Sequence, residues 1–154
     1  MAEPENLNDS LEAGEPAARF LGTWALVSFE HVLPTGARGQ LFGENPKGQI
    51  SYHSDGQMSA QLQVGSPKRL TGEQIVRIAP EEASEAWRGY LGYWGTFRID
   101  ARNNIVVHHV QGSSFPNWIG TEQARHFRFQ EDFLILEAHS PDGISTLTWR
   151  KNAV

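Results

Sequence analysis

Two side chains in this sequence combine reactive chemistry with an expected inward orientation, namely Arg125 and His108. In the strand-like stretch 121–129, one face is plainly polar and is expected to meet solvent. Its members are Glu122, Ala124, His126 and Arg128. Because side chains alternate across a strand, the opposite face places Arg125 inside together with Gln123. An inward guanidinium requires a carboxylate, a carbonyl, water or an anionic ligand, so Arg125 is the leading pocket residue. The alternatives are a pair with an internal acid such as Glu30, or a place in water at the rim.

His108 and His109 are adjacent in a strand-like stretch and therefore face opposite sides. The composition favours His108 inside, because its face ends on Val110. There it could move a proton while Arg125 and Tyr93 stabilise developing enolate charge, as in a cofactor-free isomerase, cyclase or lyase. A single inward histidine is more often a hydrogen-bonded structural residue, and that alternative stays open.

Other chemistries find little support in the sequence. The chain has no cysteine, and its six histidines lie on separate expected elements or diverge, so no metal site is predicted. No serine stands in a Gly-x-Ser-x-Gly elbow, and the glycines of stretch 36–48 lack a phosphate-binding fingerprint. No cofactor is predicted, and haem binding through His108 or His109 is a minor alternative.

The net charge of −5 belongs to the N-terminus. Five acidic residues precede any basic one, and they are Glu3, Glu5, Asp9, Glu12 and Glu15. The rest of the chain is formally neutral, which argues against nucleic acid and against an anionic membrane surface as partners. Residues 1–19 are expected to form a disordered acidic tail, followed by one domain over residues 20–154. No signal peptide or apolar span is apparent, so a cytoplasmic location is expected.

Turn signals separate eight runs rich in β-branched and aromatic residues. The expected strands are 23–32, 48–53, 57–64, 92–100, 105–111, 121–129, 133–139 and 144–151. Their hairpin order predicts an all-β fold, an eight-stranded antiparallel up-and-down barrel. One short helix is expected between the third and fourth strands, because Pro80 and Glu81 suit a first turn. Its apolar stripe (Ala83, Trp87, Tyr90 and Leu91) would cover a barrel mouth or pack on the outer wall.

Strand alternation also predicts which side chains line the barrel interior. The expected apolar wall consists of Tyr52, Met58, Leu62, Tyr93, Phe97 and Phe127, with Gln123, Arg125 and His108 orienting a polar end. The loop 112–120 carries Asn117 and Trp118, and its apolar residues should fold over a hydrophobic surface. It would cover either the open or the closed end of the barrel.

Several stretches together resemble the lipocalin-like domain family of short calycin barrels. They are 21–29 with its Gly-x-Trp, 52–60, 89–93, 108–113 and 115–123. The resemblance covers residues from about 20 to 150 and implies a barrel with an internal cavity for small, largely apolar molecules. In such barrels a late arginine, here Arg150, would lie over the indole of the first strand. The resemblance implies no particular reaction.

The sequence therefore predicts a protein that binds a small hydrophobic or amphipathic molecule in its barrel. The alternatives are the cofactor-free enzyme described above and a structural or partner-binding role for a filled barrel. A homodimer is a further possibility that the sequence leaves open.

Overall fold

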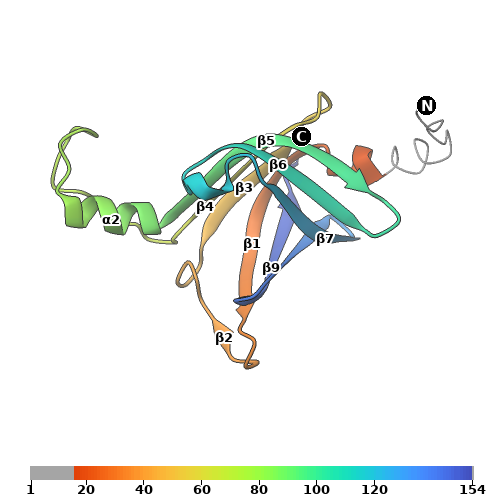
Figure 1. The fold of residues 1–154 in the computed structure, drawn as a ribbon, viewed down its shortest axis with the longest axis horizontal. Helices are drawn as coiled ribbons and strands as arrows, with labels where there is room; N and C mark the ends of the chain where they lie inside the picture. The colour runs from red at the N-terminus through yellow and green to blue at the C-terminus, as the bar shows by residue number, and fades with distance from the viewer. Residues whose placement is uncertain (1–15, 154) are drawn as a thin grey trace.

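The computed structural model describes residues 16–153, and they form a closed antiparallel β-barrel (Figure 1). The eight barrel strands are β1 (Gly22–Val32), β3 (Lys47–Tyr52), β4 (Gln57–Gln63), β5 (Tyr90–Asp100), β6 (Ile105–Ser113), β7 (Glu122–Gln130), β8 (Phe133–Ser140) and β9 (Gly143–Lys151). Each strand pairs with the next along the chain, and pairing of β1 with β9 closes the barrel. The predicted architecture is confirmed, and each predicted strand is found within two residues of its expected bounds.

A ninth strand and the helix depart from expectation in detail. The short strand β2 (Arg38–Gly39) pairs with the end of β1 and extends the barrel rim. Helix α2 (Pro80–Arg88) consequently follows β4 and precedes β5, rather than lying between a third and a fourth strand. The helix ends at Gly89, so Tyr90 and Leu91 belong to β5 and not to the helical stripe.

Helix α2 neither plugs the barrel nor packs along its wall. Together with the preceding loop it extends away from the barrel on the left of Figure 1, and none of its residues is buried. Its contact with the barrel rim runs through Trp87, whose indole N–H donates to the Ser114 carbonyl at 2.7 Å. None of the helices among residues 16–153 is long and apolar enough to cross a membrane.

Inside the barrel, the half that holds the start of β1 is filled by its own side chains. Residues 16–20 are helical and place Phe20 there with no exposed surface. Its ring packs edge-on against Tyr52, Phe127 and Phe129 at centroid distances of 4.9 to 5.0 Å. The Trp24 indole donates to the Phe20 carbonyl at 2.8 Å and anchors this segment. This half is the closed end. Of the tail predicted over residues 1–19, residues 1–15 lie outside the described residues, and residues 16–19 belong to the helical segment.

The cation over the Trp24 indole is Lys151 and not Arg150, so that expectation is wrong. The Lys151 ammonium lies 5.1 Å from the ring centroid. The strand register explains the difference, because Lys151 stands directly opposite Trp24, whereas the preceding residue, Arg150, points outward. There Arg150 lies over Phe133 and pairs with Asp132 at 3.6 Å.

Candidate ligand-binding site

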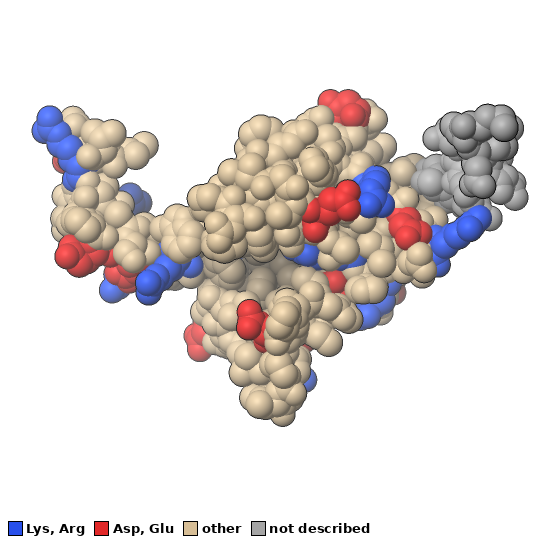
Figure 2. Space-filling model, in the orientation of Figure 1, with Lys and Arg blue, Asp and Glu red and all other residues tan. Residues whose placement is uncertain are grey.

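The open half of the barrel encloses a cavity of about 280 Å³. Its wall is mainly apolar and comes from inward positions all round the barrel. The apolar members are Phe29, Leu41, Phe42, Ile50, Ala60, Leu62, Leu91, Trp118, Leu136, Ala138, Leu147 and Trp149. The face in Figure 2 is hollowed at its centre, and neither sign of charge gathers around the hollow. A mainly apolar cavity of this kind suits a small organic molecule better than a polyanion.

Strand alternation predicted the inward faces correctly, but the structure separates the predicted site residues by depth. Five of them line the cavity: Leu62, Tyr93, Trp118, Gln123 and Arg125. Five others lie beneath it in the closed half, outside its lining: Tyr52, Met58, Phe97, His108 and Phe127. Asn117 lies in the short helix η1 (Pro116–Trp118) and is also outside the lining. The reason for the separation is that Phe20 and the aromatic rings around it fill the lower half.

His108 is fully buried and joins two tyrosines, whereas His109 is exposed. Its Nε2 lies 2.7 Å from the Tyr52 hydroxyl and its Nδ1 2.9 Å from the Tyr93 hydroxyl. Burial, aided by the positive charge of Arg125, lowers the pKa of His108 to about 3, so the ring is neutral at pH 7. A neutral imidazole donates through one nitrogen and accepts through the other.

The direction of this hydrogen-bond chain follows because each buried polar group needs a hydrogen-bond partner. The Tyr52 hydroxyl is buried, and within residues 16–153 its hydrogen-bond partner is His108. If Tyr52 donates to Nε2, no hydroxyl proton is left without an acceptor in the core. Nδ1 then carries the proton and donates to the Tyr93 oxygen. The Tyr93 hydroxyl proton is thereby free for an acceptor in the cavity.

Arg125 supplies the positive charge beside this hydroxyl. Its guanidinium donates to the neighbouring Ala124 carbonyl at 3.0 Å and lies 5.8 Å from the centroid of the Trp118 ring. Among the described residues no carboxylate forms an ion pair with it, and Glu30 pairs instead with Arg38 at 3.9 Å. Burial raises the pKa of Tyr93, and the nearby Arg125 partly opposes that rise. A guanidinium without a carboxylate partner and a phenolic hydroxyl, which hydrogen-bond each other, thus adjoin one apolar cavity.

The loop between β6 and β7 lies at the open end of the barrel, which decides between the two positions left open above. Trp118 lines the cavity and packs edge-on against Tyr93 at 5.4 Å between centroids. Phe115 packs on Trp118 at 6.1 Å and approaches Trp87 of α2 at 6.5 Å. An aromatic series therefore connects α2 to the cavity rim.

Comparison with known proteins identifies the family. A family profile described as a lipocalin-like domain matches residues 21–153. The chain belongs to the lipocalin-like domain family. Among curated proteins, the 4'-hydroxy-3'-methoxypropiophenone carrier protein ppsC of Aspergillus oryzae is 38% identical to this lipocalin-like domain over 106 residues. That match covers 61% of this chain and 96% of the relative.

Solved structures of similar shape share little sequence with this lipocalin-like domain. A redesigned β-barrel is 11% identical with a TM-score of 0.45, covering 89% of this chain and 95% of that chain. As-p18, an extracellular fatty acid binding protein, is 13% identical with a TM-score of 0.44, covering 87% of this chain and 96% of that one.

Several cavity residues were missed by sequence reasoning. Leu147 and Trp149 alternate along β9, so the same parity argument could have found them. Phe42 comes from a glycine-rich loop that carries no periodic signal, and only the fold brings it to the mouth. His31 and Ser145, also at the open end, went unassigned because they lie far apart in sequence.

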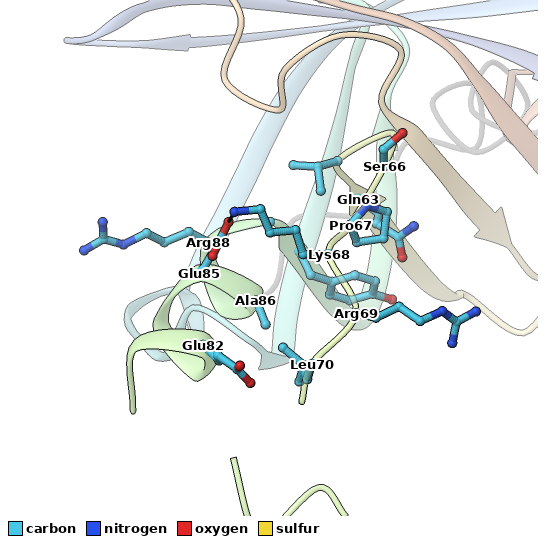
Figure 3. A pocket seen from close by; sticks show the side chains of 13 residues that line it. Gln63, Ser66, Pro67, Lys68, Arg69, Leu70, Glu82, Glu85, Ala86 and Arg88 are labelled. Atoms are coloured by element: carbon cyan, nitrogen blue, oxygen red, sulfur yellow. Dashed lines mark ion pairs between the residues drawn. The ribbon is translucent and has the colours of Figure 1, made fainter. Parts of the chain in front are cut away.

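A second hollow of about 630 Å³ lies outside the lipocalin-like barrel, between α2 and the segment 63–70 (Figure 3). Its charged groups are already engaged or directed elsewhere. Lys68 pairs with Glu85 at 3.2 Å, and Glu82 accepts hydrogen bonds from the Thr71 hydroxyl and amide. In Figure 3 the guanidinium of Arg88 points away from the hollow. The barrel cavity, with its unpaired cation, is the stronger site.

Proposed function

We propose that this lipocalin-like protein is a carrier that holds one small amphipathic aromatic molecule in its barrel, with an acceptor oxygen against Arg125 and Tyr93. The observation that carries the proposal is the unpaired guanidinium of Arg125 in an otherwise apolar cavity. Arg125 is partly buried and has no carboxylate partner among the described residues, so a ligand oxygen would supply a charge-assisted hydrogen bond that the protein does not provide.

The size of the cavity limits the ligand. Small-molecule sites usually occupy about 300–1,000 Å³, so a cavity of about 280 Å³ suits a molecule of roughly one aromatic ring with short substituents. The Aspergillus oryzae relative is named as the carrier of 4'-hydroxy-3'-methoxypropiophenone, a single-ring phenol with a ketone. A ketone or phenol oxygen would accept from both Tyr93 and Arg125, while Trp118 would pack on the ring.

The enzyme alternative is less favoured. A proton-transferring histidine works best with a pKa close to the operating pH, whereas burial lowers the pKa of His108 to about 3. Both of its nitrogens are occupied by tyrosines, and it does not line the cavity. Ligand binding requires only that His108 orient the Tyr93 hydroxyl. The isomerase, cyclase or lyase activity therefore stays a prediction from sequence, as do the cytoplasmic location and the homodimer.

The experiment is a calorimetric titration of the full chain with 4'-hydroxy-3'-methoxypropiophenone, after native mass spectrometry has established whether a molecule co-purifies. We expect one site per chain. Hydrogen bonds to charged groups contribute about 1.5–3 kcal/mol, so Arg125→Met should weaken binding roughly 10- to 150-fold.

Arg128→Met is the matched control, because Arg128 is an exposed arginine on the outer face of the same strand. Its affinity should equal that of the wild type. If Arg125→Met binds as tightly as wild type, the assigned polar anchor is wrong. If neither this phenol nor other single-ring ketones bind to the wild type, the carrier proposal fails.

A further inference from the structure

At the open end of the barrel, a serine and a histidine form a pair that neither the carrier function nor the family resemblance uses. His31 Nδ1 lies 2.8 Å from the Ser145 hydroxyl oxygen, and His31 Nε2 lies 2.9 Å from the Asp142 carbonyl oxygen. Ser145 lines the cavity, whereas His31 is 95% buried behind it. A hydroxyl, an imidazole and an orienting acceptor thus stand in series, the order found in activated serine nucleophiles.

The chemistry of the partners fixes the tautomer of His31. A backbone carbonyl only accepts, so Nε2 must carry the proton that binds the Asp142 oxygen. In the neutral ring Nδ1 then has a lone pair, and the Ser145 hydroxyl donates to it. This is the protonation pattern in which a histidine can take a serine proton as the nucleophile attacks.

Two features of the backbone hold the pair in place. His31 of β1 and Ser145 of β9 are direct partners in the closing ladder of the barrel, so both side chains project inward together. The turn that presents the Asp142 carbonyl is fixed by Gly143, whose φ is +124°. A Cβ at Gly143 would lie 2.1 Å from the Val32 carbonyl oxygen, so only glycine allows this turn to pack on β1.

We propose that Ser145 is a nucleophile activated by His31 toward small carboxylic esters that enter the barrel cavity. The Ser145 oxygen attacks the ester carbonyl carbon, and its proton passes to His31 Nδ1. The C–O bond to the leaving alcohol or phenol then breaks, and that oxygen takes the proton from His31. Water, activated by the same nitrogen, cleaves the acyl-serine and restores Ser145, so the net reaction is ester hydrolysis.

The cavity selects the substrate class. An apolar chamber of about 280 Å³ admits a short acyl chain with an aryl or alkyl alcohol, and excludes large esters. This inference does not rest on the carrier function, because it requires only that a small ester reach Ser145. Ser145 is not among the groups proposed to anchor the carried molecule.

The test uses the full chain with p-nitrophenyl acetate, and with a fluorophosphonate probe that reacts covalently with activated serines. We expect hydrolysis above the buffer rate, and one phosphonyl adduct per chain that fragmentation spectra locate on Ser145. General-base assistance is typically worth about 10²- to 10⁴-fold, so Ser145→Ala and His31→Gln should each lower the protein-dependent rate at least 100-fold.

Ser59→Ala is the matched control, because Ser59 lies on the outer face of β4, away from the cavity lining and from the turn that orients His31. Its rate and labelling should equal those of the wild type. Adduct mapping on the unmodified chain does not depend on any variant folding. No adduct, an adduct on another residue, or an unchanged rate in folded Ser145→Ala would overturn the proposal. Binding of the aromatic ketone should persist in Ser145→Ala, which separates this outcome from failure of the carrier function.

Discussion

Lowering the pH from 7 to 4 is expected to destabilise this barrel through His108. In the native structure burial and the charge of Arg125 lower the pKa of His108 to about 3, against about 6.5 for an unfolded histidine. Between these values the unfolded chain binds a proton at this site and the native chain does not, so the free energy of unfolding falls as the pH drops. Each pH unit in this window costs about 1.4 kcal/mol, so His108 alone should remove about 3 kcal/mol by pH 4.

The assay is urea unfolding at pH 7 and pH 4 for the wild type, His108→Gln and His109→Gln. Small domains have about 5–15 kcal/mol of stability, so a change of about 3 kcal/mol is readily measured. His108→Gln should be somewhat less stable than the wild type at pH 7, because Tyr52 and Tyr93 lose a hydrogen-bond partner. Its free energy of unfolding should, however, fall about 3 kcal/mol less than that of the wild type between pH 7 and pH 4. His109→Gln, altered at the exposed neighbour, should retain the wild-type decrease.

A direct reading comes from the ring resonances of His108 in the native protein, which should not titrate between pH 8 and pH 5. A native midpoint of about 6.5 would refute the argument, as would equal pH dependence in wild type and His108→Gln. Either result would also restore His108 as a candidate proton carrier and strengthen the enzyme alternative.

Two further variants test the division of the barrel into a filled and a hollow half. Phe20→Ala should cost about 3–5 kcal/mol in urea unfolding, because Phe20 is fully buried against three aromatic rings, and a loss below about 1 kcal/mol would contradict its role in the core. Ala60→Phe should leave the barrel folded by circular dichroism but weaken binding of the aromatic ketone at least tenfold. A cavity of about 150 Å³ is large enough for benzene, so a phenyl ring at position 60 would fill roughly half of this chamber of about 280 Å³. Unchanged affinity in Ala60→Phe would place the ligand outside the barrel.

The alternation of side chains was predictable because it is a local property of each strand. Met58, Leu62 and Tyr93 face inward as expected, and Arg125 shares the interior with them despite its charge. Alternation does not specify depth along the barrel axis, which depends on what fills each layer. Phe20 fills the lower layer from outside the strands, so Tyr52 and Phe127 became core where a ligand-binding wall was expected.

Contacts between distant segments were less predictable. The His31–Ser145 pair joins residues 114 apart in sequence, and it depends on the exact register of the closing strands. That register includes a bulge in β1 between Leu26 and Ser28, so simple alternation along the strand would have turned His31 outward. The position of Lys151, rather than Arg150, over Trp24 also depends on this register, because a shift of one residue reverses which of the two cations points at the indole.

The inward polar residues that suggest an enzyme in the sequence form a binding arrangement in the structure. Proton transfer requires a group that changes its protonation state at little cost near pH 7, and protonating His108 there would cost about 5 kcal/mol. The buried hydrogen bonds from Tyr52 through His108 fix the direction of one further hydrogen bond, so that the Tyr93 hydroxyl proton points to the cavity. Beside it stands the unpaired charge of Arg125. We propose that two donors held in fixed orientation at the base of an apolar chamber recognise an acceptor oxygen without exchanging a proton with it, as a carrier requires.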